Sequence, residues 1–191
     1  AVHPDSGKTT LRVVDVETGK AQELGEFGTI SCALWGPDGG AVSVAERAER
    51  GYEIHRVPVA GGEKQTLLEH AAPSHDWLPD GRLVAVRLST DVEDSAAYGG
   101  EVMLLRPGEG GEVEETILCS VQVEIDTVLD VSPDGSALLV VQAMEDHDNK
   151  LSSVTVPGGE KKTLVLGSVM AGVWSPDGAR IAVAKGSGSG G

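Results

Sequence analysis

The residue types that could do chemistry gather in three places, a His-Asp pair at 75–76 and two acidic segments. A histidine beside a carboxylate supports general acid–base catalysis when the two side chains meet. His75 and Asp76 lie on a predicted β-strand, in which adjacent side chains point to opposite faces. The pair is therefore not expected to act together, and we interpret His75 as a histidine of the core or of a central channel.

The acidic segments read EDHDN at 145–149 and STDVED at 89–94. Calcium prefers clustered side-chain oxygens, so Asp146, Asp148 and Asn149 are candidate metal ligands. The first segment lacks the twelve-residue spacing and the glycine of an EF-hand loop, and a solvated acidic loop explains the same composition. We predict no metal site and no cofactor.

Motifs of the known catalytic types do not occur in this sequence. GSGSGG at 186–191 does not fit the G-x-S-x-G nucleophile elbow, and GPDGG at 36–40 lacks the lysine and the spacing of a phosphate-binding loop. Cys32 and Cys119 are too few for a disulfide framework and have no zinc spacing, so we interpret both as small apolar residues. The chain is predicted not to be an enzyme.

Charge and composition exclude further classes of function. The 191 residues carry 30 acidic and 15 basic side chains, a net charge of −15, which disfavours nucleic acid and anionic membrane as partners. No apolar run is long enough for a transmembrane helix, so no membrane insertion is expected. No signal peptide is visible at the start of the sequence, and the compartment stays unknown.

A tight turn recurs four times and organises the chain. It reads WGPDGG, WLPDGR, VSPDGS and WSPDGA, with its prolines at 37, 79, 133 and 176. Proline presets φ for a type I turn, and a glycine takes the left-handed φ that follows, which closes a β-hairpin. The structural residues of these turns are predicted to be the four glycines Gly39, Gly81, Gly135 and Gly178.

A second hairpin with a glycine turn lies between successive PDG turns, so the repeating unit is four strands in about 43 residues. That is the size of one blade of a β-propeller, an all-β fold. WSPDG followed by an apolar strand resembles the repeats of the TolB-like β-propeller family. The resemblance implies a propeller in which Trp35, Trp77 and Trp174 pack between blades, with Val131 in the third repeat. Members of that family include scaffold proteins and the propeller domains of prolyl-oligopeptidase-type hydrolases.

The chain is predicted to be a single propeller unit over 1–185, made of four four-stranded blade-equivalents. Three blades span 28–68, 71–118 and 125–166, a split blade joins 9–24 with 169–185, and 186–191 form a flexible linker or tag. The unit is completed as a four-bladed ring, as half of an eight-bladed ring formed by two chains, or with blades that a different chain supplies. The second arrangement predicts self-association as a homodimer.

Function is expected on the variable loops that follow the second strand of each blade. The residues there that could bind a partner are Asp91, Glu93, Asp94, Tyr98, Glu145 and His147. Their acidity predicts a non-enzymatic scaffold that binds a basic protein or peptide. One alternative is the propeller domain of a prolyl-oligopeptidase-type hydrolase without its catalytic domain. Another is an engineered or excised repeat fragment, which the GSGSGG segment favours.

Overall fold

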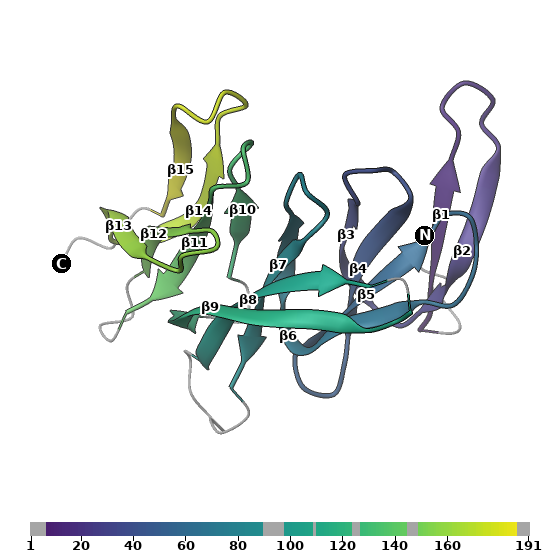
Figure 1. The fold of residues 1–191 in the computed structure, drawn as a ribbon, viewed down its shortest axis with the longest axis horizontal. Coiled ribbons are helices and arrows are strands. Elements are labelled where there is room, and N and C mark those ends of the chain that lie inside the picture. Colours follow the sequence, from purple (N-terminus) through teal and green to yellow (C-terminus); the bar gives the residue numbers. More distant parts are fainter. Residues whose placement is uncertain (1–6, 90–97, 109, 124–126, 145–148, 187–191) are drawn as a thin grey trace.

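The computed structural model describes residues 7–89, 98–108, 110–123, 127–144 and 149–186, and these residues form strands and turns without a helix (Figure 1). All strand pairs are antiparallel. The strands are β1 (Thr9–Val14), β2 (Ala21–Phe27), β3 (Ile30–Trp35), β4 (Ala41–Arg47), β5 (Tyr52–Pro58), β6 (Gln65–Trp77), β7 (Leu83–Leu88), β8 (Tyr98–Pro107), β9 (Val113–Val123), β10 (Leu129–Val131), β11 (Ala137–Ala143), β12 (Asn149–Thr155), β13 (Lys161–Leu166), β14 (Val169–Trp174) and β15 (Ile181–Lys185).

Three groups of four consecutive strands pair in chain order, which is the blade arrangement that the repeat predicts. They are β3–β6, β6–β9 and β10–β13. The first two share β6 and therefore form one seven-stranded sheet. In the middle of β6, His70 has a φ of 54°, and Ala71 pairs with Tyr52 on one side and with Arg87 on the other. The outer strand of one blade thus continues, through this bend, as the inner strand of the next.

The PDG turns join the first two strands of each group. Gly39, Gly81, Gly135 and Gly178 have φ values of 69°, 85°, 71° and 70°, in the left-handed region that a side chain with a Cβ rarely adopts. In each turn the glycine N–H donates to the carbonyl three residues earlier, at 2.8 to 3.0 Å. Turn chemistry therefore positions every inner hairpin, and with it the residues on either side.

The core lies between neighbouring groups of strands rather than inside one layer. Side chains of β7 alternate between two apolar clusters, with Val84 and Val86 on one face and Leu83 and Ala85 on the other. All four are fully buried. A strand that is covered on both faces needs no polar positions, which explains the uninterrupted apolar run LVAV.

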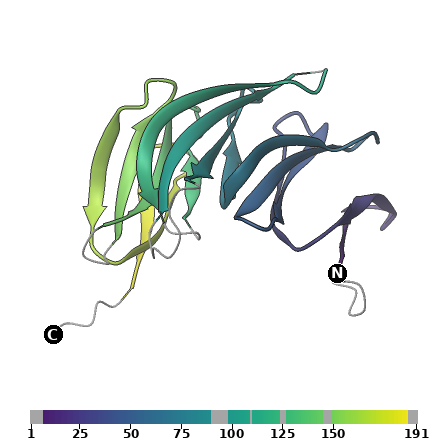
Figure 2. The ribbon, with the colours of Figure 1, turned by 90° about the horizontal axis from the view of Figure 1, so that it is seen from below.

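The two terminal hairpins are separate sheets, although each packs against the neighbouring blade. β1–β2 and β14–β15 form separate two-stranded sheets at opposite ends of an open arc (Figures 1 and 2). In the ranges that the structure describes, neither hairpin joins the other. The four-blade count, the split blade and the homodimer therefore stay predictions, while the all-β architecture with antiparallel sheets is observed.

Candidate functional site

A buried polar chain links the first complete blade to the second. Trp77 Nε1 donates to Ser43 Oγ at 2.9 Å, and Ser43 Oγ lies 2.8 Å from His75 Nε2. His75 Nδ1 lies 3.2 Å from the Pro73 carbonyl oxygen, which can only accept. Nδ1 therefore carries the proton, and Nε2 accepts from the Ser43 hydroxyl. β6 presents both His75 and Trp77 to β4 because residues two apart share a face.

The burial of this Ser-His contact determines its role. Ser43 is fully buried and His75 is 2% exposed, so no substrate reaches the hydroxyl in this conformation. Burial lowers the pKa of His75 from 6.5 to about 4, because no counter-charge offsets the desolvation of an imidazolium. A neutral imidazole that fixes a serine and a tryptophan is a structural link between blades. Nothing in the strand pattern around Ser43 distinguishes it from an ordinary core position, so the sequence gives no signal for this contact.

A second set of polar links joins the inner strands of successive blades. Asp76 Oδ2 accepts from the backbone N–H of Val131 at 2.8 Å, and Asp130 Oδ2 accepts from that of Trp174 at 2.5 Å. Asp76 and Asp130 both stand directly before the tryptophan position of their repeat. His75 and Asp76 thus act on different blades, as the strand period requires. Burial raises the pKa of Asp76, while the backbone N–H groups of Val131 and Trp77, which donate to its carboxylate, oppose the change.

The three repeat tryptophans do not share one environment. Trp77 and Trp174 are partly buried and pack against the clusters between blades. Leu139 occupies the position on β11 that corresponds to Ser43 on β4, and the buried Trp174 Nε1 has no hydrogen-bond partner among the described residues. Trp35 is 54% exposed, because β1–β2 bring no inner strand pair to cover it.

A pocket opens on the face where the variable loops begin and end. Its volume is about 470 Å³, and its lining includes His70, Arg87 and Glu101 together with Ser89 and Gly99, which flank the segment 90–97. Arg87 forms an ion pair with Glu115 at 2.5 Å. The pocket therefore has a polar lining that carries both positive and negative side chains.

Most residues that the sequence singled out for binding lie outside the described residues. These are Asp91, Glu93, Asp94, Glu145, Asp146, His147 and Asp148. Tyr98 begins β8, and Asn149 is half-buried at the start of β12. Within the described ranges, no group of three or more His, Cys, Asp or Glu side chains could hold a metal ion. The structure therefore leaves these binding and metal predictions untested.

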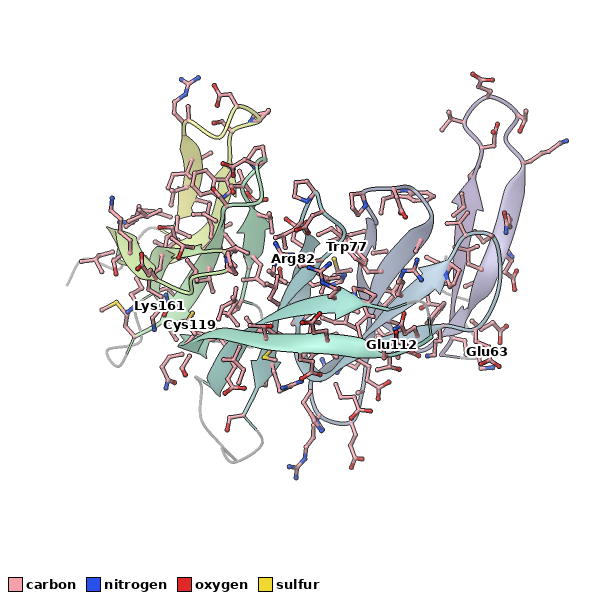
Figure 3. The ribbon with its side chains drawn as sticks, in the orientation of Figure 1. Glu63, Trp77, Arg82, Glu112, Cys119 and Lys161 are labelled. Carbon is pink, nitrogen blue, oxygen red and sulfur yellow. The ribbon has the colours of Figure 1, made fainter. Side chains whose placement is uncertain are left out.

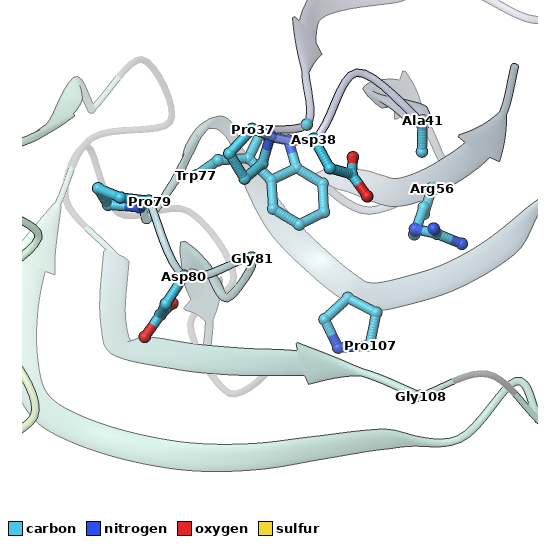
Figure 4. A pocket seen from close by; sticks show the side chains of 11 residues that line it. Pro37, Asp38, Ala41, Arg56, Trp77, Pro79, Asp80, Gly81, Pro107 and Gly108 are labelled. Carbon is cyan, nitrogen blue, oxygen red and sulfur yellow. The ribbon is translucent and has the colours of Figure 1, made fainter.

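A second hollow lies on the opposite face, between the first two PDG turns (Figure 4). Its volume is about 430 Å³, and Trp77 forms one wall with Pro37, Pro79 and Pro107 around it. Asp80 is held by Arg82, whose Nε donates to Oδ2 at 2.8 Å, and this contact lowers the pKa of Asp80. Proline rings line this hollow, and its carboxylates, Asp38 and Asp80, are held by hydrogen bonds from their own turns. We therefore interpret the hollow as a structural contact between two turns.

The two cysteines are free thiols that lie at half-buried positions. Both are partly buried, and burial raises the pKa of the Cys32 and Cys119 thiols. Cys119 lies on β9 near Lys161 of the next blade, whose Nζ donates to the Ser120 carbonyl oxygen at 2.7 Å (Figure 3). A thiol with a raised pKa is a poor nucleophile at neutral pH.

Comparison with solved structures identifies the fold. The chain is similar to the TolB protein of Agrobacterium tumefaciens, with a TM-score of 0.68, 17% identity, and coverage of 92% of this chain and 61% of that one. It is similar to TolB of Acinetobacter baumannii at a TM-score of 0.67 and 19% identity, over 94% and 44% of the two chains. An acylaminoacyl peptidase of Pyrococcus horikoshii matches at a TM-score of 0.60 and 16% identity, over 91% and 30%.

These similarities show a TolB-like fold, as the WSPDG repeats indicated. The chain spans less than two thirds of the length of either TolB structure. No protein-family profile matches the sequence, and no curated protein matches it. Among the described residues, no helix has the length and apolarity needed to cross a membrane.

Proposed function

We propose that this chain is a non-enzymatic β-propeller module that binds a basic protein or peptide segment over its variable-loop face. The observation that carries the proposal is the pocket of about 470 Å³ between Ser89 and Gly99. The segment between these residues contains Asp91, Glu93 and Asp94, and the whole chain has a net charge of −15. A concave polar site whose lining residues are joined in sequence to an acidic segment favours a cationic ligand, and the negative net charge speeds its association.

The site chemistry supports binding rather than turnover. The Ser43-His75 contact is buried in the core, and the cysteine thiols have raised pKa values. Arg87 is held by Glu115, and Glu101 lines the pocket on the neighbouring strand. These groups can orient a ligand through hydrogen bonds and charge.

The test is fluorescence anisotropy with labelled decapeptides that range from lysine-rich to glutamate-rich. We expect lysine-rich peptides to bind and added salt to weaken the binding. Neutralising the loop with Asp91→Asn, Glu93→Gln and Asp94→Asn should weaken it about tenfold. The matched control neutralises three exposed carboxylates of other turns, Glu63→Gln, Glu112→Gln and Glu160→Gln, and should leave the affinity unchanged. Equal losses in the two variants, or no binding by any peptide, would contradict the proposal.

A second candidate is the propeller domain of a prolyl-oligopeptidase-type hydrolase, because peptidase structures match this chain. They include the Pyrococcus horikoshii enzyme and a puromycin-hydrolyzing peptidase of Mycobacterium tuberculosis, of whose chains 30% and 24% are covered. This candidate predicts a native chain that carries a further α/β domain with a G-x-S-x-G elbow. Sequencing the coding region on both sides of this segment decides between the two candidates.

A further inference from the structure

The terminal hairpins are complementary halves of one blade. β14 and β15 flank a PDG turn, as the first two strands of each complete blade do, while β1 and β2 flank a glycine turn, as the last two do. Within the described ranges neither hairpin pairs with a third strand, and the two lie far apart in the arc (Figure 2). β15 and β1 therefore each present a free backbone edge, which is a template for a further strand.

The complete blades define the register that a joined blade would have. The PDG turns of the first, third and fourth repeats have equal length, and the residue in the tryptophan position pairs with Val42, Leu138 and Ile181 respectively. On the third strand, Val42 pairs with Val57 and Leu138 pairs with Val154. Ile181 should meet the equivalent residue of a third strand.

Val14 is that equivalent residue on β1. The residues that follow Val14 and Val154 are Asp15 and Thr155, and each donates its backbone N–H to the carbonyl five residues later. The two following turns therefore have the same length. Ile181 falls opposite Val14, and the rest of the register follows residue by residue.

This register places suitable partners opposite one another. Ala182 and Ala184 fall opposite Val13 and Leu11, and the exposed Arg180 falls opposite the exposed Asp15. Opposite charges at facing positions of an antiparallel pair are stabilising. The register thus pairs apolar residues along the two edges and places one pair of opposite charges at the turn.

Apolar residues of β1 and its turn are exposed where their counterparts are covered. Val16 is 97% exposed. Its counterparts Val59 and Val156 pack into interblade clusters, and their N–H groups donate to the carbonyls of Gly40 and Ser136 at 3.0 and 2.8 Å. In a joined blade the equivalent acceptor for the Val16 N–H is the Ala179 carbonyl of the partner. Val16 would then be covered as Val59 and Val156 are.

The outer faces of the two ends are apolar as well. Trp35 is 54% exposed at one end, and Val173 and Met170 are 47% and 66% exposed at the other. In the complete junctions, the equivalent tryptophans Trp77 and Trp174 pack against the preceding blade. Joining the hairpins would set β14–β15 before Trp35 in the same way.

We propose that two copies of this chain associate head to tail, with β15 of each pairing antiparallel with β1 of the other and Ile181 opposite Val14. Each copy contributes three complete blades, and the two copies together form two joined blades. The result is an eight-bladed ring with twofold symmetry. The pairing uses strand edges and leaves the variable-loop face open, so it stands or fails independently of the proposed peptide binding.

The first test is light scattering coupled to size exclusion, over a micromolar dilution series at about 0.15 M ionic strength to screen the net charge. We expect twice the chain mass of 19.7 kDa. Val16→Lys should raise the dimer dissociation constant at least tenfold while circular dichroism stays unchanged. Its control is Ile117→Lys on β9, where the side chain is 54% exposed and away from both edges. A mass near 20 kDa throughout, or equal effects of the two substitutions, overturns the proposal.

The second test determines the register and the partner. A Val14→Cys chain and an Ile181→Cys chain are mixed, unfolded, refolded together and oxidised, and the products are separated without reductant. We expect a covalent dimer from the mixture and none from either variant alone. In a control, Val13→Cys is used in place of Val14→Cys. Its thiol points to the opposite face of β1, so the covalent dimer should not form. A chain with both cysteines that cross-links within itself would show closure inside one chain and would also overturn the proposal.

Discussion

Acid should destabilise this protein through His75, by an amount that the structure allows us to estimate. The imidazole is 2% exposed, and its pKa falls from 6.5 to about 4 on folding. This difference corresponds to about 3 kcal/mol of folding free energy. A lowered histidine pKa means that the unfolded chain binds the proton first. The stabilisation is therefore complete above pH 6.5 and is lost as the pH falls toward 4.

The assay is urea unfolding monitored by tryptophan fluorescence between pH 7.5 and 4.5, at constant protein concentration because association would add to stability. Near pH 5 the native chain lacks about one proton that the unfolded chain carries at this site. The free energy of unfolding should then fall by about 1.4 kcal/mol per pH unit from His75 alone. His55 adds to this slope, because burial also lowers its pKa.

His75→Gln isolates the effect. The variant loses free energy at every pH because the ring is removed from the core, but it should lose the pH-dependent part as well. The difference between the wild-type and variant slopes is the measured quantity, and all other titrating groups cancel in it. Parallel slopes for the two proteins from pH 6.5 to 4.5 would refute a neutral buried imidazole at this position.

Four further predictions concern two turn glycines, a metal site and a link between blades. Gly178→Val should cost about 1 kcal/mol or more, which corresponds to roughly 2 to 4 °C in Tm per kcal/mol, because φ is 70°. A Cβ at this position would meet only Pro133 Cδ, at an ordinary contact distance of 3.7 Å. An unchanged Tm would argue against this turn. Gly159→Ala should cost more, because its Cβ would collide with the Leu118 carbonyl oxygen. Calcium should leave the Tm unchanged beyond screening; a saturable rise lost on Asp146→Ala and Asp148→Ala would show a metal site. Asp130→Ala should cost about 1 to 3 kcal/mol by leaving the Trp174 N–H without its acceptor, and Asp130→Asn should restore most of it.

The hairpins of this fold could be predicted from the sequence because turn chemistry is local. Proline, aspartate and glycine at fixed offsets determine a φ near 70° at Gly178 without reference to the rest of the chain. The same local logic could not show that two blades share a strand. The sequence places the change of blade between residues 68 and 71, and β6 runs through this point from Gln65 to Trp77 with a positive φ at His70.

The polar links between blades could not be predicted, because they depend on residues far apart in the sequence. Ser43 and His75 are 32 positions apart, and Asp76 and Val131 are 55 apart. Aspartate directly before the tryptophan position occurs in the second and third repeats, while Leu34 and Val173 stand there in the first and fourth. The two aspartates can be seen in the sequence, but their role depends on how successive inner strands pack, which the sequence does not show.

The composition of the strand edges gives a last argument about how the arc is completed. Outer strands that face solvent in a complete blade are protected by charge, as in KKTLVL of β13 and VEETIL of β9. Charged residues at a free edge discourage pairing with other chains. β15 reads IAVAK and carries its only charge at the last residue. An apolar edge of this kind is expected where another strand pairs. In the proposed register the partner is β1. Its Val14, Val13 and Leu11 fall opposite Ile181, Ala182 and Ala184, and Arg12 falls opposite Val183.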